Sequence, residues 1–146
     1  MADIVLEGMD DLIRALDAAG KMDEDTIQEI LEAGADVAVE EIRREIRRSR
    51  YRIADYAGHV QRGKVKRKKG SGDPYISVTL SGNTKNGTPR STVAFVLNYG
   101  REERTRSRGG AIAADYFWTR GTQNAQKKAA EAMEAVLRDK LKQEGL

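Results

Sequence analysis

The sequence predicts an α+β fold in which a small antiparallel β-sheet packs against two helices. Two long stretches carry apolar residues at helical spacing, one in the N-terminal half and one at the C-terminus. The β-prone runs are grouped between these stretches, which favours α+β over an alternating parallel-sheet fold. A chain of 146 residues has the length of one domain, and we expect residues 1–146 to form it.

The first predicted elements are short. Ile4, Val5 and Leu6 form an apolar run that predicts a strand or an extended arm. Apolar residues then recur at helical spacing from Met9 to Ala19, and Gly20 stands where a helix C-cap is expected.

The second predicted helix is long and has one apolar stripe. The stripe consists of Ile27, Ile30, Leu31, Ala35, Ala38, Val39, Ile42 and Ile46. Asp25 and Gln28 have the spacing of a capping box, although Asp23 is an alternative cap. Acids precede arginines along this helix, which suits the helix macrodipole. Gly34 costs roughly 1 kcal/mol relative to Ala, and we expect it to allow another backbone to approach closely.

The middle of the chain is basic and rich in glycine. We expect residues 49–74 to form a flexible basic arm, either irregular or a long exposed hairpin, that orders on assembly. A strand follows from Tyr75 to Leu80, started by Pro74, with turns at Gly82-Asn83 and Asn86-Gly87. Residues 91–99 contain an apolar run with little alternation and predict a central strand covered on both faces.

The C-terminal part combines a loop and a helix. Residues 101–114 predict a charged loop that also orders on assembly. The last helix is predicted to begin near Thr122. Its apolar face consists of Ala125, Ala129, Ala132, Met133, Val136, Leu137 and Leu141.

Charge is divided unevenly along the chain. Residues 1–42 hold thirteen acids and two bases, whereas residues 43–146 hold ten acids and twenty-four bases. Such a division suits a subunit whose acidic end meets the basic side of a second copy, or a domain whose basic loops meet phosphate.

No pattern of an enzyme or a cofactor site is apparent. The chain has no cysteine and one histidine, His59, so a zinc site or a Ser-His-Asp arrangement is not predicted. Gly-rich phosphate loops are missing, as are apolar runs long enough to span a membrane and the regions of a signal peptide. We therefore expect a non-enzymatic protein without cofactor, metal or membrane partner.

Two groups of residues are candidate contact surfaces. For the basic segment 43–69 we consider a protein partner, a nucleic-acid backbone or plain solvation. The candidates there for DNA or partner contact are Arg62, Lys64, Lys66, Arg67, Lys68 and Lys69. The candidates for a subunit interface are Glu29, Glu32, Asp36, Glu40, Glu41, Arg101, Arg104, Arg106, Arg108 and Trp118. Trp118 lies in the aromatic run 116–118, which is either a core anchor or an intersubunit contact.

Several of these segments resemble the HK97 gp10-like family of tailed-phage proteins. Residues 6–12 (LEGMDDL) are similar to the family's opening strand and helix start, and the helix from Ile27 to Ile46 to its second element. Residues 95–100 (FVLNYG) resemble the end of a family strand. Tyr116-Phe117 before the last helix resembles the family's C-terminal close.

The resemblance implies a structural virion protein. Proteins of this kind are neck or tail-completion subunits that join head to tail, and related proteins form rings. The implied partners are further copies of the chain in a head-to-tail ring, the connector or adaptor, and tail-tube or tail-terminator proteins. Duplex DNA in the ring lumen is a further implied partner. The implied location is the virion, after assembly in the host cytoplasm. The competing hypothesis is a small nucleic-acid-binding module that uses residues 43–69.

Overall fold

The computed structural model of this chain describes residues 4–7, 23–102 and 110–143. The predicted helix from Met9 to Ala19 lies outside these residues. The described elements are β1 (Ile4–Glu7), α2 (Glu24–Arg48), the 3₁₀ helix η1 (Ala54–His59), β2 (Val60–Arg62), β3 (Lys66–Arg67), β4 (Pro74–Leu80), α3 (Arg90–Tyr99) and α4 (Phe117–Gln143).

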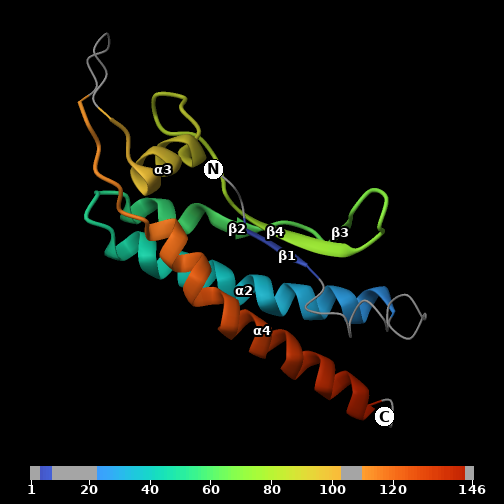
Figure 1. The fold of residues 1–146 in the computed structure, drawn as a ribbon. Coiled ribbons are helices and arrows are strands. Elements are labelled where there is room, and N and C mark those ends of the chain that lie inside the picture. The colour runs from blue at the N-terminus through green and yellow to red at the C-terminus, as the bar shows by residue number, and fades with distance from the viewer. Residues whose placement is uncertain (1–3, 8–22, 103–109, 144–146) are drawn as a thin grey trace.

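The long helix α2 lies between the sheet and α4 (Figure 1). In the sheet, β4 pairs with β1 on one side and with β2 and β3 on the other, always antiparallel. The predicted α+β class, with a small antiparallel sheet on a long helix, is therefore confirmed.

Strand β4 packs one face into the core. Pro74, Ile76, Val78 and Leu80 are buried, and the residues between them are partly exposed. This period of two is typical of a strand that is covered on one side. The buried side belongs to the same core cluster as the apolar residues of α2.

The basic arm is a hairpin arm paired with β4 within the monomer. Val60 to Arg62 pair with Leu80 to Val78, and Lys66 and Arg67 pair with Tyr75 and Pro74. The register shifts between the two pairings, because residues 63–65 lie opposite only residues 76 and 77; this is a β-bulge. Hydrogen bonds from Lys68 N to Asp73 O (2.9 Å) and from Gly72 N to Lys68 O (3.0 Å) close the turn. The hairpin alternative is confirmed, and the expectation that this arm orders only on assembly stays a prediction.

Helix α2 begins at the alternative cap. The Asp23 carboxylate Oδ1 accepts the Thr26 backbone N–H at 2.7 Å. Hydrogen bonding with the Thr26 side chain, and then with this N–H, lowers the pKa of Asp23. The capping box from Asp25 is therefore wrong. Burial on α2 extends beyond one stripe and includes Gly34, Glu41 and Glu45, because α4 covers a second side.

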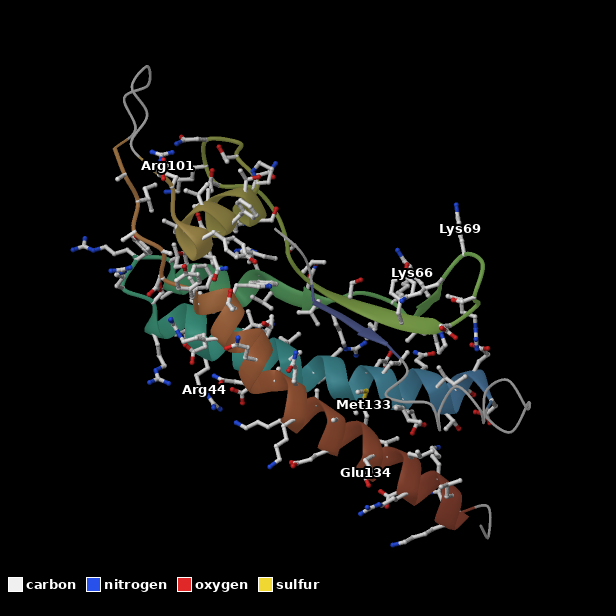
Figure 2. All side chains as sticks on the ribbon, viewed as in Figure 1. Arg44, Lys66, Lys69, Arg101, Met133 and Glu134 are labelled. Carbon is white, nitrogen blue, oxygen red and sulfur yellow. The ribbon has the colours of Figure 1, made fainter. Side chains whose placement is uncertain are left out.

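Two glycines allow α2 and α4 to pack closely as antiparallel neighbours. A Cβ on Gly121 of α4 would lie 2.9 Å from Ile42 Cα of α2, so this glycine admits the partner backbone. A Cβ on Gly34 would lie 2.7 Å from Met133 Sδ (the Met133 side chain is labelled in Figure 2). The prediction of a close backbone at Gly34 was therefore wrong in kind: a side chain occupies that space.

Residues 91–99 form helix α3, and the prediction of a central strand is wrong. Ala94 and Asn98 are buried one helical turn apart, and Phe95 and Tyr99 are exposed at the same spacing. A short apolar run without alternation fits a helix as well as a buried strand. Pro89 precedes the helix, and Gly100, at φ +75°, ends it.

Helix α4 begins at Phe117, five residues before the predicted start at Thr122. Tyr116 lies directly before it at φ 55°. The buried side of α4 matches the predicted face at Ala125, Ala129, Met133 and Leu137.

Candidate assembly interface

The acidic candidates lie on α2 and contact bases of the same chain. Arg62 of β2 binds Glu32 at 3.1 Å and Asp36 at 2.8 Å, and Lys140 of α4 binds Glu29 at 3.2 Å. Burial alone would lower the Arg62 pKa, but the hydrogen bond and charge of Asp36, with Glu32, outweigh it and raise the pKa. Acids from the acidic part of the chain thus form ion pairs with bases from the basic part within one molecule.

Glu40 and Glu41, adjacent in sequence, differ in position. The Glu40 side chain is largely exposed and pairs with Arg43 at 3.3 Å. The Glu41 side chain is only 6% exposed and binds Lys128 of α4 at 2.7 Å. Glu41 therefore belongs to the packing of α2 on α4, and Glu29, Asp36 and Glu40 remain the exposed members of the acidic face.

The basic segment 43–69 is divided into two clusters. Arg44, Arg47 and Arg48 lie at the C-terminal end of α2, whereas Arg67 of the hairpin binds Glu24, at the N-terminal end of α2, at 2.6 Å. A helix of 25 residues is about 37 Å long. Figure 2 shows Arg44 far from Lys66 and Lys69. Residues 43–69 therefore form two separate basic clusters and not one continuous surface.

Of the hairpin candidates, Lys64, Lys66 and Lys69 are exposed. Lys68 is partly buried and its backbone closes the hairpin turn. Arg62 and Arg67 bind carboxylates of α2, so they attach the hairpin to the long helix.

Sequence reasoning missed a row of buried carboxylates between α2 and α4. Glu45 is 7% exposed and lies between Arg120 at 3.0 Å and Arg48 at 3.8 Å. Glu41, one turn earlier, lies between Lys128 at 2.7 Å and Arg44 at 3.4 Å. The spacing of Glu41 and Glu45 at i and i+4, on the side of the helix next to the apolar stripe, was the available signal.

We call the exposed cations along this contact the basic seam. Its members are Arg44, Arg47, Arg48, Arg120, Lys127 and Lys128.

The base of the charged loop is closed by an antiparallel bridge. Arg101 and Ile112 each donate a backbone N–H to the other's carbonyl at 2.9 Å, and Arg101 Nε donates to Gly110 O at 3.2 Å. Arg104, Arg106 and Arg108 lie outside the described residues.

Trp118 lies in the core, with 3% of its surface exposed. Phe117 beside it is fully buried, whereas Tyr116 is exposed. The core-anchor alternative therefore holds for two of the three aromatics, and Trp118 offers no surface to another subunit.

Helix α3 presents the largest exposed apolar group among the described residues. Phe95 and Tyr99 are 44% and 47% exposed, and their ring centroids are 5.0 Å apart. Beside them a groove of about 260 Å³ is lined by Thr88, Thr92, Val93, Val96, Leu97, Arg101 and Ile112. Sequence reasoning missed this surface because it assigned the segment to the interior of a sheet.

The part of the chain that the structure describes contains no cluster of three or more His, Asp or Glu side chains that could hold a metal ion. In the same residues, none of the helices has the length and apolar character that crossing a bilayer requires.

Comparison with known protein families identifies a match. The family described as "Bacteriophage HK97-gp10, putative tail-component" matches residues 10–100, which include α2, the hairpin, β4 and α3. Searches of curated proteins and of solved structures found no match. The resemblance inferred from the sequence is thereby confirmed. Because the match covers more than half of the chain, this protein belongs to the HK97-gp10-like family of bacteriophage tail components.

Proposed function

We propose that this chain is a non-enzymatic neck or tail-completion subunit that assembles head-to-tail into a ring between the connector and the tail of the virion. The family assignment supports a structural role in a phage tail. A ring requires two different surfaces on each copy, so that one repeated contact closes by rotation.

The observation that carries the proposal is the exposed apolar surface of α3. Aromatic residues are favoured at protein interfaces, and Phe95 and Tyr99 stand together beside an apolar groove. Residues 91–99 carry no charge, whereas a third of the whole chain is charged. Covering such a surface with a second copy lowers the free energy of the complex.

The complementary surface is the exposed stripe of α2. Ala33, Asp36, Val37 and Glu40 recur at helical spacing, and each is at least partly exposed. This stripe is acidic with small apolar side chains, and the α3 surface is apolar with Arg101 at its groove. Opposite charge and matched apolar character make these two surfaces complementary, as a heterologous contact between copies requires.

Mass measurement of the full chain over a range of concentrations tests the proposal. We expect the wild type to form closed oligomers at high concentration. The double variant Phe95→Ser, Tyr99→Ser should remain monomeric under the same conditions. Tyr116→Ser is the matched control, because it removes an exposed aromatic from a different surface and should assemble like the wild type.

Charge reversal tests the second surface. Asp36→Lys with Glu40→Lys should weaken assembly, whereas Glu41 is unsuitable because it is buried against Lys128. A wild type that stays monomeric at every concentration would contradict the ring, and assembly that survives the α3 variant would exclude this surface.

The ring proposal includes its neighbours and location. The partners are the connector or adaptor on the head side and tail-tube or tail-terminator proteins on the other. A tail component belongs to the virion, and the host cytoplasm is the proposed site of assembly.

A further inference from the structure

The basic seam keeps its negative charge inside and its positive charge outside. Glu41 and Glu45 are 6% and 7% exposed. The cations that bind them are 43% to 71% exposed: Arg120, Lys128, Arg44 and Arg48. Each carboxylate is therefore shared by two cations. Arg120 also lies 3.8 Å from Asp115, which lies 3.8 Å from Arg50, so the set around Glu45 has three cations for two acids and the set around Glu41 has two cations for one acid.

Two further features make the seam more positive. Arg47 and Lys127 are exposed and lie at helical spacing from seam cations: Arg47 is three residues after Arg44, and Lys127 is seven residues after Arg120. On these two helices the nearest exposed acids, Glu40 and Glu131, lie beyond the Glu41 pairs, at the end of the seam away from Arg120. The surface between them and Arg120 is therefore strongly electropositive.

We propose that the basic seam binds the phosphate backbone of duplex DNA. The sets around Glu41 and Glu45 are one helical turn apart, about 6 Å along α2, so the cations form a regular row. Guanidinium groups suit phosphate oxygens because they can donate two hydrogen bonds side by side. The buried carboxylates hold Arg120 and Lys128 in place before any ligand arrives, which lowers the entropy cost of binding.

The seam lacks the features of a protein-binding surface. Among the described residues, the exposed large apolar side chains are Phe95, Tyr99 and Tyr116, none of which lies between Arg120 and Lys128 on α4 or on α2. A protein interface needs apolar or aromatic anchors at its centre, whereas non-specific DNA binding needs mainly positive charge. The seam does not include the α3 surface of the proposed ring, but Arg44 continues the exposed α2 stripe one turn beyond Glu40, so the test below measures assembly as well as DNA binding.

The test compares two double variants of equal charge change. Arg44→Gln with Arg48→Gln removes two seam cations and leaves Glu41 bound to Lys128 and Glu45 bound to Arg120, so the fold is retained. Lys64→Gln with Lys69→Gln removes two exposed cations from the hairpin. Anisotropy of a labelled 30-base-pair duplex is measured for both variants and the wild type over several salt concentrations.

We expect the seam variant to bind at least about tenfold more weakly at low salt. The plot of log K against log salt has a negative slope, and the loss of two phosphate contacts should make that slope shallower by about 1.8. The hairpin variant should bind like the wild type, and mass measurement should show that the seam variant still assembles. Loss of binding in the hairpin variant alone would show that DNA binds the hairpin, and it would overturn the proposal for the seam. A wild type without salt-dependent binding, or one that prefers polyglutamate to the duplex, would overturn the proposal.

Discussion

Asn98 of α3 caps the first turn of α4: its side-chain Oδ1 accepts the backbone N–H of Trp118 at 2.9 Å. The same oxygen accepts the Thr119 N–H at 3.3 Å, and Asn98 Nδ2 donates to Thr119 Oγ1 at 3.0 Å. The first N–H groups of a helix have no partner within it, so a buried helix start needs an acceptor from elsewhere. Asn98 is fully buried and supplies it across twenty residues of sequence.

Asn98→Ala should therefore destabilise the protein by about 2 kcal/mol. The substitution leaves the buried N–H groups of Trp118 and Thr119 without an acceptor and opens a small cavity. Chemical denaturation monitored by Trp118 fluorescence measures the change. Asn86→Ala, at an exposed turn, is the matched control and should change the stability by less than about 0.5 kcal/mol.

Gly121→Ala should also destabilise the fold, although alanine favours helices by about 1 kcal/mol. The new Cβ would lie 2.9 Å from Ile42 Cα, and backbone at that distance can yield only if α2 and α4 separate. We expect a net loss of about 1–3 kcal/mol in denaturation experiments. Gly58→Ala, where a Cβ meets no atom within 4 Å, should be close to neutral. A Gly121→Ala variant as stable as the wild type would show that the two helices adjust without cost.

Local sequence patterns predicted the elements that bury one regular face. The helical spacing from Ile27 to Ile46 predicted α2, and the β-prone run from Tyr75 to Leu80 after Pro74 predicted β4. The prediction for residues 91–99 was wrong, because this uncharged run has no periodicity that distinguishes a strand from a helix. The clearest contact of this helix with the rest of the chain is the cap that Asn98 provides to α4, which joins residues far apart in sequence.

Arg120→Met should cost more stability than Arg48→Met. Arg120 binds Glu45 at 3.0 Å, is 43% exposed and also donates to the Asp115 carbonyl. Arg48 binds the same carboxylate at 3.8 Å and is 71% exposed. We expect losses of about 1–2 kcal/mol for Arg120 and less than about 0.5 kcal/mol for Arg48 in parallel urea titrations. Equal effects would mean that Glu45 does not distinguish its two partners.

The stabilisation by the Asp23 cap should depend on pH. Its pKa is lowered from the ordinary value of 3.8 in the folded protein, so the ionised carboxylate stabilises folding above the unfolded pKa. That stabilisation is lost as the pH falls through the folded pKa. Asp23→Asn keeps the acceptor but cannot ionise, so the wild type should melt higher at pH 7 and lose the advantage by about pH 2. Asp139→Asn, an exposed site far from a helix start, should show no such convergence.

The candidate site was harder to predict than the fold. Charge counts identified the acidic helix and the basic segment, but they contain no information on which acid meets which base. Glu41 and Glu45 are buried because α4 covers a second side of α2, and Arg62 reaches Asp36 because β2 pairs with β4. Both facts depend on contacts between residues far apart in the chain.

The bridge between Arg101 and Ile112 has a practical consequence. The bridge joins the two ends of this segment, so the distance between them does not depend on the number of residues that connect them. Doubling the length of a closed loop costs only about 0.6 kcal/mol. We therefore expect an epitope or a fluorophore site inserted between positions 102 and 110 to leave the helices and the sheet unaltered, because these elements lie outside the bridged segment.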